Sequence, residues 1–298
     1  MDEAAWITRY IAPLVTSAGA DGLRDDVALL TAIGPTIATM DTLVEGVHFL
    51  SSDPVATVGQ KLIRVNVSDI HAKGAEPLEA LLSIAWPHDR SEHDFAALMS
   101  GIERDLQGFT VSLIGGDLVR HDGPLTLTLT LTGRCIGKRP VRRSGGGAGD
   151  ALFLDGEIGW GGAGLSAAQS GNNPQLAARY QVPQISDRAS AQIVAEQASA
   201  SMDVSDGLLL DVSRLAEASG CGAQLDLERV PLAVETAEIA QILDQCTAGD
   251  DYRILLSAPS GLKIPGFTEI GKLTESPGLQ LRFRAQPVNT PSTLGFEH

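Results

Sequence analysis

Short apolar segments of this chain end repeatedly in aspartate. IATMDT, VNVSDI and LIGGDL carry Asp41, Asp69 and Asp117. LRDDVALL, SMDVSDGL and TAGDDYRI add Asp25, Asp26, Asp203, Asp206, Asp250 and Asp251. One such aspartate is usually a turn residue or a helix cap. Several carboxylates brought together repel one another unless divalent cations lie between them, and ligand sets made only of oxygen favour Mg²⁺. The repetition therefore predicts bound Mg²⁺ and, through it, phosphate groups such as those of ATP.

The stretch TMDTLVEGVHF, residues 39–49, places carboxylates and a histidine at the end of an apolar run. A buried carboxylate is costly unless it is paired or binds a metal. Asp41 therefore either lies in solvent or faces a cation. His48 is either a partly buried turn residue or a ligand contact, and the residues alone leave both interpretations open.

Two segments are similar to nucleotide-binding loops. GFTEIGKL, residues 266–273, is close to a P-loop, but Leu273 replaces the hydroxyl residue that would hold magnesium, so coincidence explains it better. GWGGAG, residues 159–164, matches the G-x-G-x-x-G turn that binds dinucleotides, although no acidic residue ends a clear second strand about 20 residues later. A nicotinamide-dependent oxidoreductase therefore stays an alternative, beside a glycine-rich turn that is structural or touches a phosphate.

The composition indicates ordinary hydrophobic cores and no nucleic-acid partner. Of the 298 residues 43% are hydrophobic, which argues against disorder, and the length suggests about two domains. The net charge of −15 disfavours binding to nucleic acid, because neutralising its phosphates requires Lys and Arg. Anionic partners therefore require local basic residues, helix N-termini or metal ions.

No segment is expected to enter a membrane or to direct secretion. The N-terminal MDEAAWITRY lacks an apolar core, and the longest apolar runs are far shorter than the ~20 residues of a membrane span. Cys135, Cys221 and Cys246 have no zinc-ligand spacing and fit a reducing compartment. The sequence therefore predicts a cytoplasmic protein without a membrane partner.

The elements that must position these residues alternate between strands and helices. LTLTLTLTG, residues 125–133, alternates Leu and Thr strictly and is a confident strand. Further strands are expected near 36–40, 79–86, 110–114, 151–155, 223–227, 252–258, 267–271 and 279–283. Helices are expected near 54–72, 91–107, 162–170, 186–199, 206–219 and 235–245. KRPVRRSGGGAGD indicates a boundary, with domains at 1–138 and 139–298 and an α/β or α+β fold.

The ordered set DDVALL, DTLVEGVHF, VNVSDIHAKGAEP, LIGGD, RRSGGGAGD, MDVSDGLLLD, CGAQLDL and GDDY resembles the thiamine-monophosphate kinase family. This family lies within the aminoimidazole-ribonucleotide synthase-like ATP-binding superfamily. The resemblance implies a two-domain α/β (α+β) fold, in which an N-terminal mixed sheet with helices binds ATP and Mg²⁺ and forms a homodimer, followed by a C-terminal α/β domain. It implies Mg²⁺-dependent transfer of the γ-phosphoryl group of ATP to thiamine monophosphate.

The same resemblance implies the site residues, position by position. Metal contacts are implied for Asp26, Thr39, Asp41, Asp69, Asp117, Asp203 and Asp206. ATP contacts are implied for Gly116, Asp117, Arg143 and Ser205, and thiamine-phosphate contacts for His48, Asp250 and Phe296. The acceptor phosphate has a second pKa of about 6, so it needs no general base, and catalysis by Asp41, Asp69, Asp117 and Arg143 is alignment and charge neutralisation.

The chain departs from the pattern of the family at several positions. Met40 replaces a hydroxyl residue that would contact metal, and Leu118 replaces a threonine after GGD. GGAGD lacks a lysine and a proline, and Asp250 is shorter than the usual glutamate. A non-catalytic ATP-binding homologue and a kinase of another phosphorylated acceptor are therefore the alternatives within this superfamily.

Overall fold

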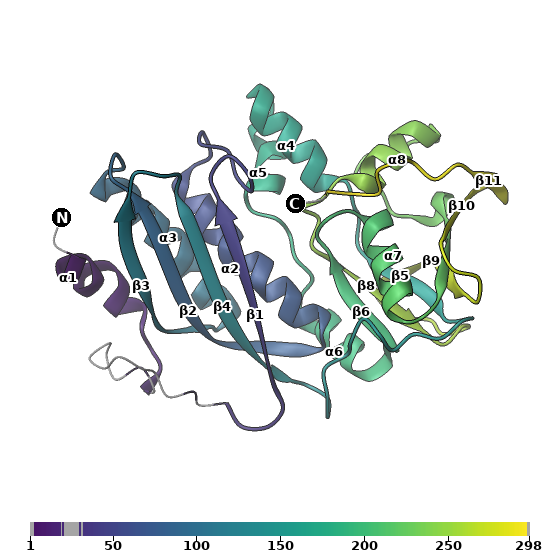
Figure 1. The fold of residues 1–298 in the computed structure, drawn as a ribbon, viewed down its shortest axis with the longest axis horizontal. Helices are drawn as coiled ribbons and strands as arrows, with labels where there is room; N and C mark the ends of the chain where they lie inside the picture. Colours follow the sequence, from purple (N-terminus) through teal and green to yellow (C-terminus); the bar gives the residue numbers. More distant parts are fainter. Residues whose placement is uncertain (1–2, 19, 21–29, 31, 297–298) are drawn as a thin grey trace. The chain divides into compact units, whose positions relative to one another are not determined.

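The computed structural model describes residues 3–18, 20, 30 and 32–296. Asp25 and Asp26 lie outside the described residues. The chain forms two compact units (Figure 1). The first unit comprises residues 1–70 and 76–134, and the second comprises residues 71–75 and 135–298. The division falls a few residues before the expected boundary, and a short segment from the N-terminal half belongs to the second unit.

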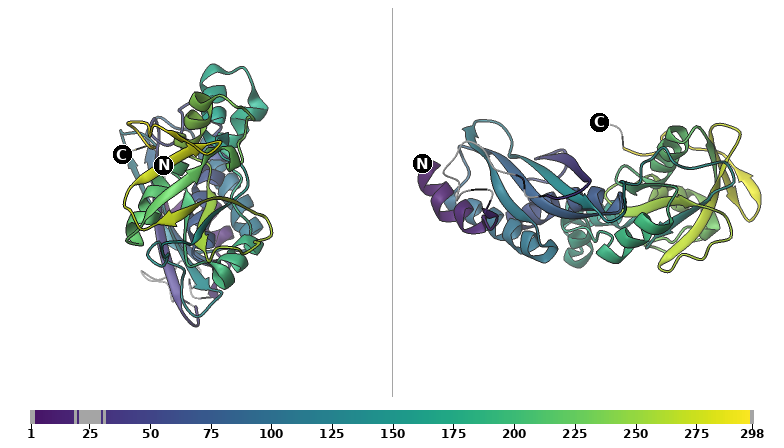
Figure 2. Two further views of the ribbon diagram at one scale, coloured as in Figure 1. Left: turned by 90° about the vertical axis from the view of Figure 1, so that its right-hand side faces the viewer. Right: turned by 90° about the horizontal axis from the view of Figure 1, so that it is seen from below.

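The first unit is a four-stranded mixed sheet with helices on one face (Figure 1, Figure 2). Its strand order is β1-β4-β2-β3, with β1 antiparallel to β4 and β2 parallel to β3. The strands are β1 (Thr36–Val44), β2 (Ala75–Pro87), β3 (Ser112–His121) and β4 (Thr126–Cys135). The helices are α2 (Val55–Ala72) and α3 (Glu92–Phe109). The strands and helices expected in this region are therefore confirmed, with β1, β2 and β3 longer than expected.

Residue alternation divides the first sheet into two different faces. On β4, Leu127, Leu129 and Leu131 are fully buried toward the helices, whereas the intervening threonines point to the opposite face. This opposite face is not covered by any element of the unit that the structure describes, and it carries Met40, Leu81 and Val119, whose exposed fractions are 64%, 43% and 46%. We call it the open face.

Local chemistry fixes the ends of α3 and its distance from α2. Ser91 and Asp94 form a reciprocal capping box at the start of α3, and Thr110 ends it in a left-handed conformation with φ 58°. A Cβ atom on Gly101 would lie 1.9 Å from the carbonyl oxygen of Ala56, so only glycine permits this approach of α3 to α2. The N-terminal segment α1 (Glu3–Trp6), η1 (Ile7–Ile11) and η2 (Ala12–Leu14) packs Trp6 beside Phe95, with ring centroids 4.5 Å apart.

The second unit is built on a seven-stranded mixed sheet in the order β11-β10-β7-β9-β5-β8-β6. Its strands are β5 (Ala151–Asp155), β6 (Ala200–Val204), β7 (Gly222–Asp226), β8 (Arg253–Ala258), β9 (Phe267–Thr274), β10 (Leu279–Phe283) and β11 (Gln286–Val288). Its helices are α4 (Trp160–Ser170), α5 (Pro174–Gln181), α6 (Arg188–Gln197), α7 (Leu208–Ala218) and α8 (Ile239–Thr247), with a short 3₁₀ turn η4 (Leu227–Arg229). β6, β11 and α5 were not expected from the sequence.

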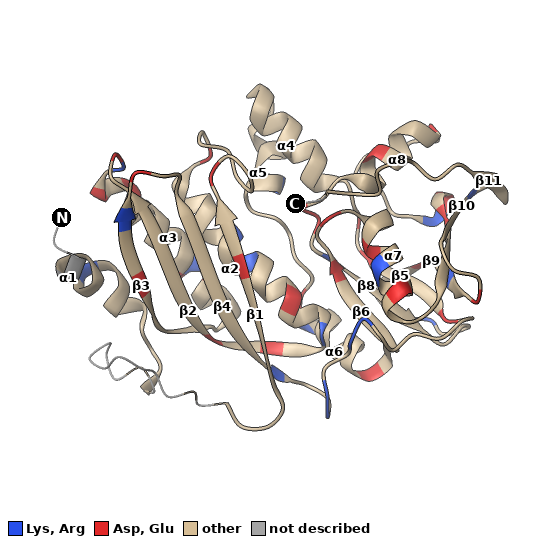
Figure 3. Cartoon of the chain, viewed as in Figure 1, with Lys and Arg blue, Asp and Glu red and all other residues tan. Residues whose placement is uncertain are grey.

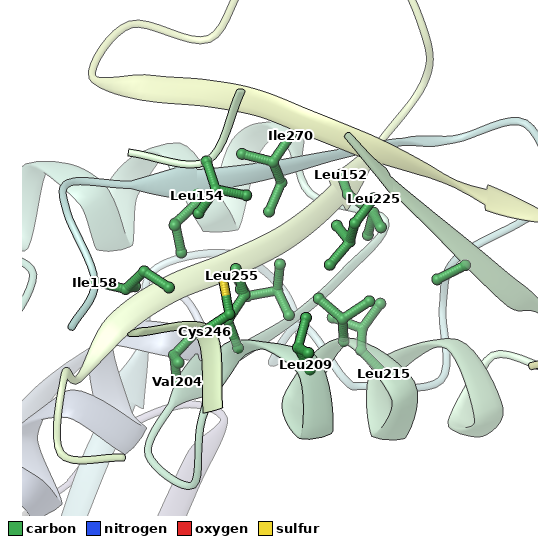
Figure 4. Packing of buried hydrophobic residues seen from close by; sticks show 14 of the residues in the cluster. Leu152, Leu154, Ile158, Val204, Leu209, Leu215, Leu225, Cys246, Leu255 and Ile270 are labelled. Atoms are coloured by element: carbon green, nitrogen blue, oxygen red, sulfur yellow. The ribbon is translucent and has the colours of Figure 1, made fainter. Parts of the chain in front are cut away.

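Aliphatic side chains form the core of the second unit. Leu209 and Leu215 on α7 face Leu225 and Leu255 of the sheet, and all four are fully buried (Figure 4). Acidic residues occur along both units (Figure 3). No helix in the described part of the chain is long and apolar enough to cross a membrane.

A buried polar network anchors residues 71–75 in the second unit. Asp155 accepts hydrogen bonds from the backbone N–H of Ile254 (2.6 Å) and from Ser186 Oγ (2.8 Å). The carbonyl of Ser186 in turn accepts a hydrogen bond from His71 Nδ1 at 2.8 Å, and Lys73 donates to the carbonyl of Ser201. The end of α2 is therefore hydrogen-bonded into the second unit through side chains.

Burial raises the pKa of Asp155 to about 6, above its ordinary value of about 3.9, although its hydrogen bonds act in the opposite direction. The folded protein therefore binds this proton more tightly than the unfolded chain, and the free energy of unfolding falls as the pH rises from about 4 to about 6. Asp155→Asn keeps the acceptor oxygen and removes the charge. We expect it to become more stable relative to the wild type across that window, by up to about 3 kcal/mol above pH 6.

Urea denaturation of both proteins from pH 4 to 8 measures this difference. The exposed Asp122→Asn is the matched control and should show no comparable pH-dependent difference from the wild type. A constant difference between Asp155→Asn and the wild type across this range would contradict the assignment.

Candidate active site

Thr39, Asp41 and Asp69 come together in the first unit. Thr39 and Asp41 lie two residues apart on β1, so both point to the face covered by the helices. Thr39 Oγ1 donates to a carboxylate oxygen of Asp69 on α2. The backbone N–H of Asp41 donates to Asn66 Oδ1 at 3.2 Å, one helical turn before Asp69. Strand β1 and helix α2 thus bring together three of the residues implied as metal contacts.

The charges of this cluster suit a cation. Burial, and then the negative charge of Asp69, raise the pKa of Asp41 to about 7. A divalent cation would favour the ionised carboxylate, and Mg²⁺ commonly binds one or two carboxylates together with substrate phosphates and water. The oxygen donors of Asp41 and Asp69, with the hydroxyl of Thr39, fit such an ion. Among the described residues, no three His, Cys, Asp or Glu side chains form a group that could hold a metal on their own.

His48 lies in the turn that follows β1. The backbone N–H of Val44 donates to His48 Nδ1 at 3.1 Å, which implies a neutral ring with its proton on Nε2. Lys61, which is 1% exposed, donates to the carbonyl of His48 at 2.9 Å. Gly46 supplies the positive φ of 82° that the turn requires. His48 is therefore held by local hydrogen bonds in a form that donates through Nε2.

Asp117 does not join this cluster within the chain. Asp117 on β3 pairs in register with Ser83 on β2, so its side chain points to the open face, where it is exposed. Asp41 points to the opposite face of the same sheet, and β4 and β2 separate their strands. A Cβ atom on the preceding Gly116 would lie 1.8 Å from the carbonyl oxygen of Leu82, so glycine is required there.

In the second unit, Ser205 and Asp206 form a tightly held loop after β6. Both backbone N–H groups donate to one carboxylate oxygen of Asp211, each at 3.1 Å. The carboxylate of Asp206 forms an ion pair with Arg214 on α7. Burial, and then the charge of Asp206, raise the pKa of Asp211 to about 6. Asp203 is buried on β6, just before this loop.

Asp211 and Arg214 were missed as contributors to the site. Asp211 is the last residue of MDVSDGLLLD. Its position five residues after Asp206 was the sequence signal that could have indicated its role. Arg214 had no sequence signal beyond its position on the helix expected at 206–219.

Two segments, residues 250–252 and the segment at Phe296, bind this loop and the end of β6 through three backbone hydrogen bonds of 2.8 Å each. The N–H of Asp250 donates to the carbonyl of Ser205, and the N–H of Phe296 donates to the carbonyl of Asp206. The N–H of Tyr252 donates to the carbonyl of Val204. The second unit therefore brings together the implied nucleotide contact Ser205 and the implied acceptor contacts Asp250 and Phe296.

Arg143 lies at the C-terminal end of α7, whereas the loop of Ser205 and Asp206 precedes its N-terminal end. The carbonyl of Arg143 accepts a hydrogen bond from Ser219 Oγ at 2.8 Å, just after the last residue of that helix. Asp206 lies just before the first residue, and an 11-residue helix is about 16 Å long. The structure does not bring the backbone of Arg143 to the loop that carries Ser205 and Asp206.

The glycine loop 159–164 is a structural turn. The backbone N–H groups of Gly159 and Gly161 donate to the two carboxylate oxygens of Asp251 at 2.8 and 3.0 Å. Burial raises the pKa of Asp251 to about 7 despite these bonds. The carboxylate thus occupies the anion position at the start of α4 where a dinucleotide would place its pyrophosphate, which disfavours the nicotinamide alternative. All but the first residue of the P-loop-like segment 266–273 lie in strand β9, which is not the loop that a phosphate would require.

Comparisons with known proteins identify the family. Residues 24–135 match the model of the AIR synthase related protein N-terminal domain, and residues 147–284 match that of the C-terminal domain. Thiamine-monophosphate kinase of Caulobacter vibrioides is 33% identical, over 93% of this chain and 84% of the relative.

Two solved structures extend the comparison to the fold. Thiamine-monophosphate kinase from Stenotrophomonas maltophilia superposes with a TM-score of 0.80 at 27% identity, over 94% of this chain and 96% of that one. AaThiL complexed with AMPPCP and TMP superposes with a TM-score of 0.77 at 30% identity, over 87% of this chain and 86% of that one. The chain therefore belongs to the AIR synthase related family and, within it, to the thiamine-monophosphate kinases.

Proposed function

We propose that this protein transfers the γ-phosphoryl group of ATP to the phosphate of thiamine monophosphate, giving thiamine diphosphate and ADP. The observation that carries the proposal is the similarity, over most of both chains, to AaThiL complexed with AMPPCP and TMP. AMPPCP is an ATP analogue. The clusters around Asp41 in the first unit and Ser205 in the second are the parts of this chain that we assign to the site.

The reaction requires alignment and charge neutralisation more than proton transfer. An oxygen of the acceptor phosphate, already ionised, attacks the γ-phosphorus as the bond to the bridging oxygen of ADP breaks. Bound Mg²⁺ would neutralise charge on the phosphate oxygens. Asp41 and Asp69, with Thr39, would hold it in the first unit. In the second unit, Asp203 and Asp206 are the proposed further contacts, and Arg214 partly neutralises Asp206.

The acceptor is recognised through a donor and a carboxylate in this proposal. His48 presents Nε2–H, which can donate to an oxygen of the acceptor. Asp250 supplies a carboxylate for the cationic thiazolium ring, and Phe296, whose exposed fraction is 49%, an apolar surface. Cys135, Cys221 and Cys246 are free thiols, which fits the cytoplasm, where ATP is available.

We also propose that the chain is a homodimer joined through the open face. Single exposed apolar residues are ordinary, but Met40, Leu81 and Val119 share one sheet face that no element of the described unit covers. A second copy presents the same apolar and threonine surface and can cover it. Asp117 and Gly116 lie on β3 of this sheet, with Asp117 on the open face. Any role of Asp117 in phosphate or metal binding would then belong to the dimer.

The kinase assignment predicts equal amounts of thiamine diphosphate and ADP from ATP, Mg²⁺ and thiamine monophosphate, and no product with EDTA. Asp69→Asn should lower kcat at least 1000-fold, roughly 4 kcal/mol of transition-state stabilisation, without unfolding the protein. Chromatography measures both products, and thermal melting checks folding. Asp244→Asn, an exposed carboxylate on α8, is the control and should retain full activity.

Full activity of a folded Asp69→Asn protein would refute the metal role of that residue. Binding of ATP without formation of either product in the wild type would leave a non-catalytic homologue or another phosphorylated acceptor as the better assignment.

The dimer proposal predicts that Leu81→Arg yields monomers, because a charged side chain in the centre of the open face cannot be buried against a second copy. Sedimentation velocity should show the wild type at twice the mass of the variant. Leu262 is matched in exposure, 40% against 43%, but lies in the loop between β8 and β9 of the second unit, so Leu262→Arg should remain dimeric. A monomeric wild type, or a dimeric Leu81→Arg, would contradict the proposal.

A further inference from the structure

We propose that Tyr252 is a positioning residue for the acceptor, because its hydroxyl fixes the carboxylate of Asp250 that faces the cationic ring. This inference rests on the function proposed above and adds to it the group that sets the orientation of Asp250. Tyr252 Oη donates to Asp250 Oδ1 at 2.7 Å. The ring of Tyr252 is buried, with 7% of the residue exposed, so the hydroxyl cannot swing away.

The backbone of this loop is strained in a way that serves the contact. Asp250 and Tyr252 both adopt left-handed conformations, with φ of 67° and 52°. A left-handed conformation is unfavourable for an ordinary residue, less so for Asp than for a bulky Tyr. Strain of this kind persists where the surroundings fix the backbone, and it is common at ligand-binding sites.

The surroundings fix this loop from both sides. Asp250 and Tyr252 donate their N–H groups to the carbonyls of Ser205 and Val204, each at 2.8 Å. Between them, Asp251 points the other way and accepts the N–H groups of Gly159 and Gly161. The loop is therefore held between β6 and the start of α4, and within it Tyr252 Oη binds one oxygen of the Asp250 carboxylate.

The chemistry of tyrosine suits this task. A neutral hydroxyl binds one oxygen of the carboxylate and does not itself cancel the negative charge. Lysine or arginine at the same position would neutralise part of that charge, as Arg214 does for Asp206. The geometry therefore favours an acceptor with a positively charged ring over an uncharged analogue of the same shape.

The test compares Tyr252→Phe with Tyr10→Phe. Tyr10 Oη donates to Glu92 at 2.8 Å in the first unit, so the control loses the same kind of tyrosine–carboxylate bond away from the proposed site. Titration calorimetry measures binding of thiamine monophosphate and of an isosteric analogue whose five-membered ring is uncharged. Steady-state kinetics measures KM for both substrates and kcat.

We expect Tyr252→Phe to weaken binding of thiamine monophosphate about tenfold, as for loss of one hydrogen bond to a charged group. Binding of the uncharged analogue, KM for ATP and kcat should change less than about twofold, since those steps do not depend on Asp250. Asp250→Asn should reproduce the lost preference for the charged ring, and Tyr10→Phe should behave as the wild type.

Equal weakening of the charged and uncharged ligands, or parallel losses in kcat and in ATP binding, would show a merely structural role and overturn the inference. Wild-type binding in Tyr252→Phe would overturn it as well. If the wild type itself binds neither ligand, the proposed function fails and the inference fails with it.

Discussion

The cost of burying carboxylates governs this structure. A buried carboxylate requires hydrogen-bond donors or cations. Asp155, Asp211 and Asp251 each accept backbone N–H groups, and each joins segments that are distant in sequence or fixes a loop. Asp41 instead lies beside a second carboxylate, and both its burial and that neighbour raise its pKa. The first kind is structural, and the second kind has the chemistry of a cation site.

The two faces of the sheet in the first unit also carry different kinds of residue. One face buries the leucines of β4 and holds Asp41 next to α2, whereas the other face carries the threonines and Asp117. Because side chains alternate along a strand, a shift of one residue would exchange the two sets. The register shift between Ala80 and Leu81 on β2 helps to determine which face Asp117 occupies.

Periodicity predicted most of the fold, since residues 126–135 form β4 where Leu and Thr alternate, and α2 and α3 match their expected ranges closely. It did not predict β6, because that fully buried strand has no alternation and its segment ASMDV lacks the apolar run that revealed the equally buried β5, ALFLD. The pairing of Asp251 with Gly159 joins residues 92 apart, and no local pattern encodes such a contact. The same limit applies to residues 71–75, whose place in the second unit depends on contacts of His71 with Ser186.

The second unit shows how a strongly acidic chain can prepare a surface for anionic substrates. Its loop at Ser205 is held by the carboxylate of Asp211 and by the backbone of residues 250–252, so the proposed nucleotide and acceptor contacts share one set of hydrogen bonds. A displacement of the 249–252 loop would therefore disturb Ser205 as well as Asp250. Since two phosphate-bearing substrates must align to within a fraction of an ångström for in-line transfer, this shared rigidity is a physical reason for the strained backbone at Tyr252.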